Sequence, residues 1–418
     1  MSEARFLKLE YNKLYKQINS KIIMKIKDVW AEKVHDSRKK ETIRIYVKTD
    51  FGIWSTSSPS GKSTGKHETL SFPESVSSSI KLLDSLKEDI LELEIESFND
   101  LEKVENIVDK KEAGANTLYA LEASILKALA YSEKKELWQF INPDAKKMPF
   151  PVGNVIGGGL HTPETHGRKA DFQEFLVIPK MKKFSDCVEA MKKAHSMIGE
   201  HLGAKKVKGS LNDEGAWSTS LGNSECLDIL NIVRKEIAEE SGEKIDIGVD
   251  VAASSFYAPD IYHYTNPEVL MNTKEQINYV SGLADKFKIF YIEDPVDEEN
   301  FCGFKNFREK NPGRIVVGDD LIVSSEARFL TALKERSIDA VILKPNQQGS
   351  LLEIKKIVYL AKKYNVALVM SHRSGETMDS TIADLAFGFQ CDYIKTGVHG
   401  KEREIKLRRL VEIEKKIG

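Results

Sequence analysis

Apolar and polar residues follow two different rhythms in the first third of this 418-residue chain. Residues 21–54 alternate with a period of two, as in residues 43–47 (IRIYV), which is typical of strands with one buried face. From residue 73 to residue 141 the apolar residues recur at helical spacing, most regularly over residues 116–141. Strands followed by helices predict a small α+β domain over residues 21–142. Residues 1–20 precede it as a short amphipathic helix or a loosely held extension.

Short β-rich runs recur over residues 143–418, and helical stretches fill most of the intervals. The runs cover residues 175–178, 245–251, 289–292, 315–317, 340–343, 367–370 and 393–394. Most of them end near a polar residue: Asp250, Glu293, Asp319, Lys344, His372 and Lys395. The last five of these residues follow one another at steps of 26, 25, 28 and 23, about the length of one strand plus one helix. Repeated βα units predict a (β/α)₈-type barrel, an α/β fold whose C-terminal strand ends carry the catalytic groups.

Three of these strand ends would direct carboxylates, from Asp250, Glu293 and Asp319, toward one place. Neighbouring carboxylates repel one another, and a divalent cation removes that repulsion. Oxygen ligands without cysteine favour Mg²⁺ or Mn²⁺ over Zn²⁺. Lys344 and Lys395 end nearby strands, and a lysine beside a divalent cation is driven toward its neutral form, which makes it a candidate base. The pattern therefore predicts metal-assisted proton abstraction.

Other polar segments add candidates whose roles stay open. Glu174 and Glu214 are acids that could join the site, although a solvated or capping carboxylate is the commoner role for an isolated acid. Residues 371–377 (SHRSGET) follow an apolar strand and combine hydroxyl, guanidinium and flexible backbone, which suits a phosphate or carboxylate group. Residues 60–65 (SGKSTG) lack the full spacing of a phosphate-binding P-loop, so we reject a P-loop nucleotidase.

Composition narrows the class of protein further. Lys plus Arg number 62 and Asp plus Glu 64, and the formal charge of −2 gives no sign of nucleic acid or an anionic membrane as a partner. Apolar runs such as residues 366–370 are far shorter than the ~20 residues of a membrane span. Residues 1–20 lack the apolar core of a signal peptide. The four cysteines are widely spaced, as expected for reduced thiols in a cytoplasmic protein.

In their order and spacing, a set of short segments resembles the enolase family, the 2-phosphoglycerate dehydratases of glycolysis. The resemblance runs from Asp36 to Ile417 and includes residues 59–65, 114–116, 154–161, 173–175, 213–215, 250–254, 293–295, 318–321, 343–347, 371–377 and 394–397. It implies an enolase-type barrel, TIM-like but with the order ββαα(βα)₆, over residues 143–418 behind an N-terminal α+β cap domain. It also implies a homodimer.

The resemblance implies two Mg²⁺ per active site, with Mn²⁺ as a substitute. Asp250, Glu293 and Asp319 would hold the first ion, and Ser63 would help to hold the second with the substrate phosphate. A lysine base assisted by Mg²⁺ is the general pattern of this enzyme superfamily.

The resemblance likewise implies the acid–base and substrate-binding residues. Lys344 would remove the C2 proton of 2-phosphoglycerate, and Glu214, with Glu174 beside it, would help the C3 hydroxyl to leave. The implied substrate-binding residues are His161, Gln173, His372, Arg373, Ser374 and Lys395.

Three departures from the family pattern bear on the substrate and on subunit contacts. Lys62 stands where the family usually has alanine, the segment 161–174 is about four residues longer than usual, and residues 71–79 replace a usual stretch. Two alternatives therefore stay open. A related lyase acting on a phosphonate analogue would fit an altered loop pocket. A non-catalytic, enolase-like binding protein would be free to lose Lys344, Glu214 or a metal ligand, and none of these is lost.

Overall fold

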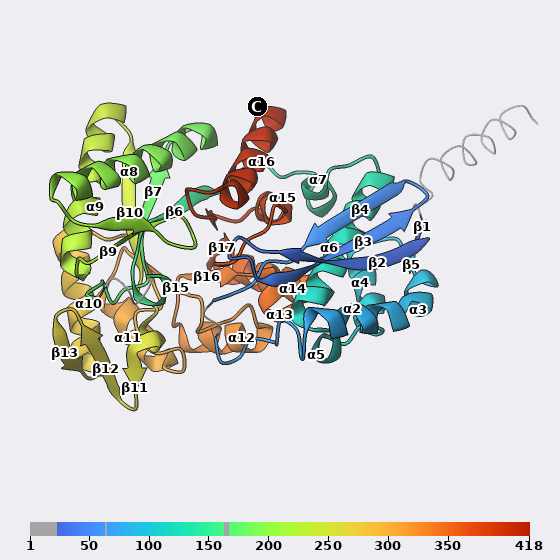
Figure 1. Ribbon diagram of the computed structural model, residues 1–418, viewed down its shortest axis with the longest axis horizontal. Helices are drawn as coiled ribbons and strands as arrows, with labels where there is room; N and C mark the ends of the chain where they lie inside the picture. Colours follow the sequence, from blue (N-terminus) through green and yellow to red (C-terminus); the bar gives the residue numbers. More distant parts are fainter. Residues whose placement is uncertain (1–22, 63–64, 163–166) are drawn as a thin grey trace, which may run out of the picture.

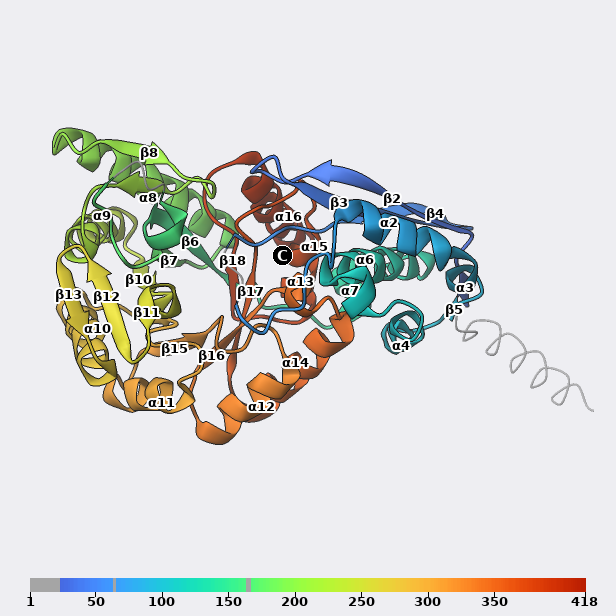
Figure 2. The ribbon, with the colours of Figure 1, turned by 60° about the horizontal axis from the view of Figure 1, so that its bottom comes forward.

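The computed structural model describes residues 23–62, 65–162 and 167–418. The predicted extension of residues 1–20 and Ser63 therefore lie outside the described residues. Two regions lie side by side in Figures 1 and 2: an N-terminal cap, drawn mostly in blue and cyan, and a larger barrel, drawn from green to red. In the described part of the chain, no helix has both the length and the apolar character needed to cross a bilayer.

The cap contains an antiparallel sheet in the order β2 (Asp28–His35), β3 (Glu41–Thr49) and β4 (Gly52–Ser57). The predicted alternation is confirmed, because Ile43, Ile45 and Val47 of β3 are buried. Gly52 makes the turn into β4 with a φ of 138°, which residues with a side chain rarely adopt. The long helix α6 (Ala115–Ser132) lies against β3 and β4. The smaller elements are β1 (Met24–Lys25), α2 (Val76–Ser85), α3 (Lys87–Leu91), β5 (Glu94–Ile95), α4 (Leu101–Glu105) and α5 (Lys110–Ala113).

The helical pattern predicted over residues 116–141 is confirmed, and the structure divides it between two helices. α6 ends at Ser132, and α7 (Leu137–Ile141) follows. Between them Lys134 has a φ of 59°, a left-handed conformation that stops a right-handed helix. Residues 133–136 (EKKE) are all charged, so they offer no apolar face that would carry the helix onward.

Eight strands form the barrel: β6 (Phe150–Gly157), β7 (Glu174–Lys180), β10 (Lys244–Asp250), β14 (Tyr291–Glu293), β15 (Ile315–Gly318), β16 (Ala340–Leu343), β17 (Ala367–Ser371) and β18 (Tyr393–Lys395). Pairing between β18 and β6 closes the barrel, with Tyr393 opposite Phe150. β7 is antiparallel to both of its neighbours, and the later strands are parallel.

Two strands and two helices begin the barrel, and alternating strands and helices complete it, so the predicted ββαα(βα)₆ order is confirmed. The helices are α8 (Phe184–Ala204), α9 (Asn223–Ser241), α10 (Thr273–Phe287), α11 (Phe301–Lys310), α12 (Glu326–Glu335), α14 (Leu351–Tyr364), α15 (Thr381–Gly388) and α16 (Lys401–Ile417). Shorter elements lie between them: β8 (Gly209–Leu211), β9 (Trp217–Thr219), β11 (Tyr257–Ala258), β12 (Ile261–Thr265), β13 (Glu268–Met271) and α13 (Pro345–Gln348).

Candidate active site

One end of the barrel gathers the polar residues predicted at the strand ends. They are the last residues of β10, β14 and β18 and the residues directly after β15, β16 and β17: Asp250, Glu293, Lys395, Asp319, Lys344 and His372. Because β7 runs antiparallel to β10, its first residue, Glu174, lies opposite Asp250 at the same end. The barrel therefore brings together side chains that are far apart in the sequence.

Three buried carboxylates lie together at this end. Asp250, Glu293 and Asp319 each place one oxygen within 4.8 Å of the others. Lys395 lies against them, with Nζ 2.8 Å from Oε1 of Glu293 and 3.3 Å from Oδ2 of Asp250. Burial disfavours the ammonium, but Glu174, Glu293 and Asp250 outweigh it and hold the pKa of Lys395 well above its ordinary value. Oδ1 of Asp319 is buried without a hydrogen-bond partner among the described residues, so the cluster has an acceptor left for a cation.

Lys344 forms a buried ion pair with Asp319. Burial again opposes the charged form, but the carboxylate of Asp319 raises the pKa of Lys344 above its ordinary value. The backbone N–H of Lys344 donates to Oγ of Ser324 at 2.9 Å, and that hydroxyl donates to Oε1 of Gln347 at 2.6 Å. These bonds fix the backbone between β16 and α13. Lys344 stays an ammonium as long as Asp319 is its partner.

A second cluster, which contains two acids and a histidine, consists of His161, Glu174 and Glu214. Nδ1 of His161 lies 3.5 Å from Oε1 of Glu174 and 3.6 Å from Oε2 of Glu214. Burial raises the pKa of Glu174 to about 8, although Lys395, 2.7 Å from its Oε2, acts in the opposite direction. Asn154 donates from Nδ2 to Oε2 of Glu214 at 3.1 Å. Glu174 is thus a carboxyl group that keeps a proton near neutral pH.

Arg373 lines the cleft where the cap meets the barrel, and it is almost fully buried. Its Nη2 donates to both oxygens of Glu68, at 3.1 and 2.9 Å, and its Nη1 donates to Oδ1 of Asn346 at 3.3 Å. Arg38, from the cap, donates to Oγ of Ser374 at 3.4 Å. This side of the cleft joins cap and barrel and offers guanidinium and hydroxyl donors, which suit an anion.

Most of the predicted site residues line one narrow cleft. Its lining is Gly61, His161, Gln173, Glu174, Glu214, Asp250, Lys344, Ser371, His372, Arg373, Ser374 and Lys395. Glu293 and Asp319 do not line it, but they contact the two lysines that do. Ser63 follows Gly61 and Lys62 in the chain and lies outside the described residues.

Sequence reasoning missed the residues that support this constellation. Asp294 accepts the backbone N–H of Asp319 at 3.0 Å and that of Asp320 at 2.7 Å, and these three residues form a further acid group. Glu68, which holds Arg373, and Asn154, which holds Glu214, received no role either. The acid pairs in residues 293–295 (EDP) and 318–321 (GDDL) were the one available signal, because two adjacent acids at a strand end are costly without a function.

A closed barrel with acid–base groups at the C-terminal strand ends defines a TIM-barrel enzyme. Comparisons with known proteins identify the family. The family profile "Enolase, N-terminal domain" matches residues 26–141, and "Enolase, C-terminal TIM barrel domain" matches residues 145–418. Together they account for most of the chain.

Curated proteins named enolase are similar to nearly the whole chain. The protein of Methanocorpusculum labreanum is 35% identical and is matched over 93% of this chain and 98% of its own length. Those of Methanosphaera stadtmanae and Pyrobaculum aerophilum are 34% and 33% identical, each over 94% of this chain and 97% of their own length. This chain belongs to the enolase family. It is accordingly a lyase of the phosphopyruvate hydratase type, as the resemblance predicts.

Proposed function

We propose that this chain catalyses the Mg²⁺-dependent dehydration of 2-phospho-D-glycerate to phosphoenolpyruvate and water. The observation that carries the proposal is the meeting of two lysines, two acid groups and a buried arginine around one cleft. The reaction belongs to glycolysis and gluconeogenesis. A cytoplasmic location and assembly into a homodimer are parts of the same proposal, and they rest on the family resemblance.

The buried carboxylates fit a divalent cation. Asp250, Glu293 and Asp319 offer oxygen atoms only, these atoms converge within 4.8 Å, and Oδ1 of Asp319 has no partner in the described part of the chain. We assign the first Mg²⁺ to these three residues and the second to a site that includes Ser63, with Mn²⁺ as a substitute. When bound, Mg²⁺ would supply positive charge to the substrate carboxylate and so acidify the C2–H bond next to it.

Lys344 is the proposed base for the C2 proton. Its ion pair with Asp319 favours the ammonium form. A metal ion held by Asp319 would compete for that carboxylate and would favour the neutral amine, which can accept a proton. Lys395 lies against the carboxylate of Glu293, and its positive charge suits the carboxylate group of the substrate. Arg373 and Ser374 are the proposed phosphate donors, and His161, Gln173 and His372 complete the lining.

Glu214 and Glu174 are proposed to assist the departure of the C3 hydroxyl. They share His161 as a neighbour. Burial raises the pKa of Glu174 to about 8, whereas His161 and other cationic groups together outweigh burial at Glu214 and hold its pKa below the ordinary value, so a proton on this pair at neutral pH resides on Glu174. A proton donor must be protonated before the reaction, and the raised pKa of Glu174 allows this pair to supply the acid.

The test follows phosphoenolpyruvate absorbance and the exchange of the C2 hydrogen with solvent in separate assays. Lys344→Ala should abolish both activities, because the base is gone. Glu214→Gln should lose dehydration and keep measurable exchange, and Glu174→Gln should fall between wild type and Glu214→Gln. Each acid–base group should be worth about 10²- to 10⁴-fold.

The alternatives predict other results. A phosphonate lyase would show no turnover of 2-phosphoglycerate while C2 exchange on a phosphonate analogue remained. A non-catalytic binding protein would show neither reaction with Mg²⁺ present. Exchange at the wild-type rate in Lys344→Ala would overturn the assignment of the base.

A further inference from the structure

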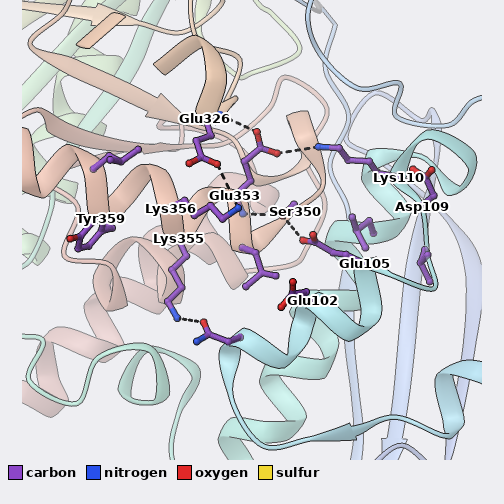
Figure 3. Close-up of a pocket in the computed structure, with 15 residues that line it drawn as sticks. Glu102, Glu105, Asp109, Lys110, Glu326, Ser350, Glu353, Lys355, Lys356 and Tyr359 are labelled. Carbon is purple, nitrogen blue, oxygen red and sulfur yellow. Dashed lines mark hydrogen bonds and ion pairs between the residues drawn. The ribbon is translucent and has the colours of Figure 1, made fainter. Parts of the chain in front are cut away.

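A cavity of about 940 Å³ lies between the cap and the barrel and shares no lining residue with the active-site cleft. Figure 3 shows side chains from α4 and α5 of the cap facing side chains of α12 and α14 of the barrel. Its volume falls within the range of small-molecule sites in proteins. The proposed reaction does not use this cavity.

The lining of the cavity carries more negative than positive charge. Five carboxylates and three lysines line the cavity, an excess of two negative charges. Each lysine already has a partner: Glu353 for Lys110 at 3.1 Å, Glu326 for Lys356 at 3.6 Å, and Asn99 for Lys355 at 2.8 Å. The remaining carboxylates, on Glu102, Glu105 and Asp109, have no cationic partner among the ion pairs of the described residues. Glu105 accepts a hydrogen bond from Oγ of Ser350 at 2.5 Å, and Asp109 accepts one from the backbone N–H of Lys111 at 2.8 Å, so neither of these neutral donors offsets the negative charge. All three belong to the cap wall, so the unbalanced charge is concentrated there.

A fourth carboxyl lies directly behind this wall. Glu122 is fully buried on α6, one turn after Leu118, which lines the cavity, so both face the same way. Its Oε2 accepts the backbone N–H of Leu351 at 2.6 Å, and its Oε1 has no hydrogen-bond partner among the described residues. Burial and the negative charge of Glu105 raise the pKa of Glu122 well above its ordinary value. A positive group beside Glu105 would relieve this crowding of acids.

The arrangement does not suit a single metal ion. In the part of the chain that the structure describes, the acid groups that converge tightly enough for a metal all lie at the barrel end, and none includes Glu102, Glu105 or Asp109. The opposite wall is partly apolar, with Leu352, Leu360 and the exposed ring of Tyr359. Separate carboxylates facing apolar surface match a ligand whose positive charges are spaced along an aliphatic chain.

We infer that this cavity binds a linear aliphatic polyamine. Its ammonium groups pair with Glu102, Glu105 and Asp109, and its methylene groups lie along Leu352 and Leu360. Glu102 and Glu105 are one turn apart on the same face of α4, roughly 4.5 Å along the axis, a spacing that suits ammonium groups separated by three or four methylenes. The face of Tyr359 offers a site for a further ammonium by a cation–π contact.

Isothermal titration calorimetry with spermidine tests this inference on the full chain, in buffer saturated with Mg²⁺ to keep the acidic cleft occupied. Spermidine should bind, whereas 1,8-octanediol, a chain of similar length without charge, should not. Glu102→Gln and Glu105→Gln should each weaken binding roughly two- to fivefold, the range of a partly exposed charge pair, and the double variant should weaken it more. The matched control is Glu112→Gln, an exposed acid of α5 outside the cavity, which should leave the affinity unchanged.

Thermal denaturation of each variant without ligand separates loss of binding from loss of folding. Spermidine should raise the melting temperature of the wild type and of Glu112→Gln, because a ligand that binds the folded state stabilises it. The double variant should show little rise. Absence of binding at millimolar spermidine, or equal affinity in the wild type and the double variant, would overturn the inference.

Discussion

Glu122 shows at the scale of one residue how a buried carboxyl couples stability to pH. Its side chain is fully buried, and burial together with Glu105 raises its pKa well above the ordinary value of 4.5. The folded protein therefore keeps a proton on Glu122 at pH values where the unfolded chain has released it. A group that binds more protons in the folded state makes the free energy of unfolding fall as the pH rises.

Glu122→Gln removes this titration and keeps an acceptor for the N–H of Leu351. As the pH rises above 4.5, we expect the wild type to lose stability relative to the variant, by up to about 1.4 kcal/mol in the free energy of unfolding per pH unit. The melting temperature of the variant should rise relative to that of the wild type over the same range. Denaturation curves across the neutral range measure it, with Glu112→Gln as control. Parallel pH dependences for Glu122→Gln and the wild type would contradict the prediction.

Lys62 is a second residue whose role a single substitution can settle. Its Nζ lies 3.5 Å from Oδ2 of Asp213, next to Glu214, and both partners are partly exposed. If Lys62 also attracts the substrate phosphate, it does so equally in the ground and transition states, because the phosphate does not react. Such uniform binding changes KM and spares kcat.

Lys62→Ala should raise KM for 2-phosphoglycerate by roughly 1.4- to 5-fold at low salt, leave kcat nearly unchanged and make KM less sensitive to salt. Lys66→Ala, in the same loop but paired with Glu298, is the matched control. Steady-state kinetics at two ionic strengths provide the measurement. If the KM of Lys62→Ala at low salt equals that of the wild type, Lys62 is only a solvated surface residue.

At the scale of an element, β6 is the strand that sequence periodicity misses, although it closes the barrel. Pro151 and Gly153 interrupt its apolar pattern, and both residue types are uncommon inside strands. The structure explains the glycine, because a Cβ at position 153 would lie 2.7 Å from Sδ of Met191 and 2.7 Å from Cγ2 of Val398. Helix α8 can approach the barrel here only where no side chain intervenes.

Gly153→Ala should therefore destabilise the protein by about 1–3 kcal/mol, as expected for overpacking of a core. Chemical denaturation measures the change. Gly203→Ala, in α8 where an added Cβ would have no atom within 4 Å, serves as control and should be neutral or stabilising. A Gly153→Ala protein of wild-type stability would show that α8 moves away without cost.

At the scale of the whole molecule, the acidic end of the barrel depends on positive charge. Lys344 and Lys395 offset part of the charge of Asp250, Glu293 and Asp319, and the acid group of Asp294, Asp319 and Asp320 adds to it. Neighbouring carboxylates without enough counter-charge repel one another across several strands. A cation bound at this end should therefore stabilise the entire barrel.

We expect EDTA to abolish activity and lower the melting temperature, and Mg²⁺ or Mn²⁺ to restore both. Asp319→Asn should weaken Mg²⁺ binding about tenfold or more, because one ligand charge is lost. Asp144→Asn, on an exposed turn of the barrel's entry segment, is the control for charge alone. Full activity in a chelated sample would rule out the metal-assisted mechanism.

The sequence alone determined which residues stand at strand ends and how many residues separate them along the chain. The steps between Glu293, Asp319, Lys344, His372 and Lys395 predicted a barrel, because each strand and helix consumes a fixed length of chain. The fold and family are confirmed, while the bounds of the two domains and the roles of the site residues stay predictions. Local periodicity suffices for such features because it depends on burial of one face of one element.

Only the tertiary structure decided which partner each charged group has. Glu68 holds Arg373 across 305 positions of sequence, and Asp294 fixes the backbone of Asp319 from the neighbouring strand. The cavity between α4 and α14 has no signal in the sequence, because its two walls come from separate regions. Such contacts depend on barrel closure and on how the cap docks. The hydrophobic pattern along a chain reflects the burial of each residue. The pairing of charged side chains depends instead on distances that arise only when segments far apart in the sequence pack together.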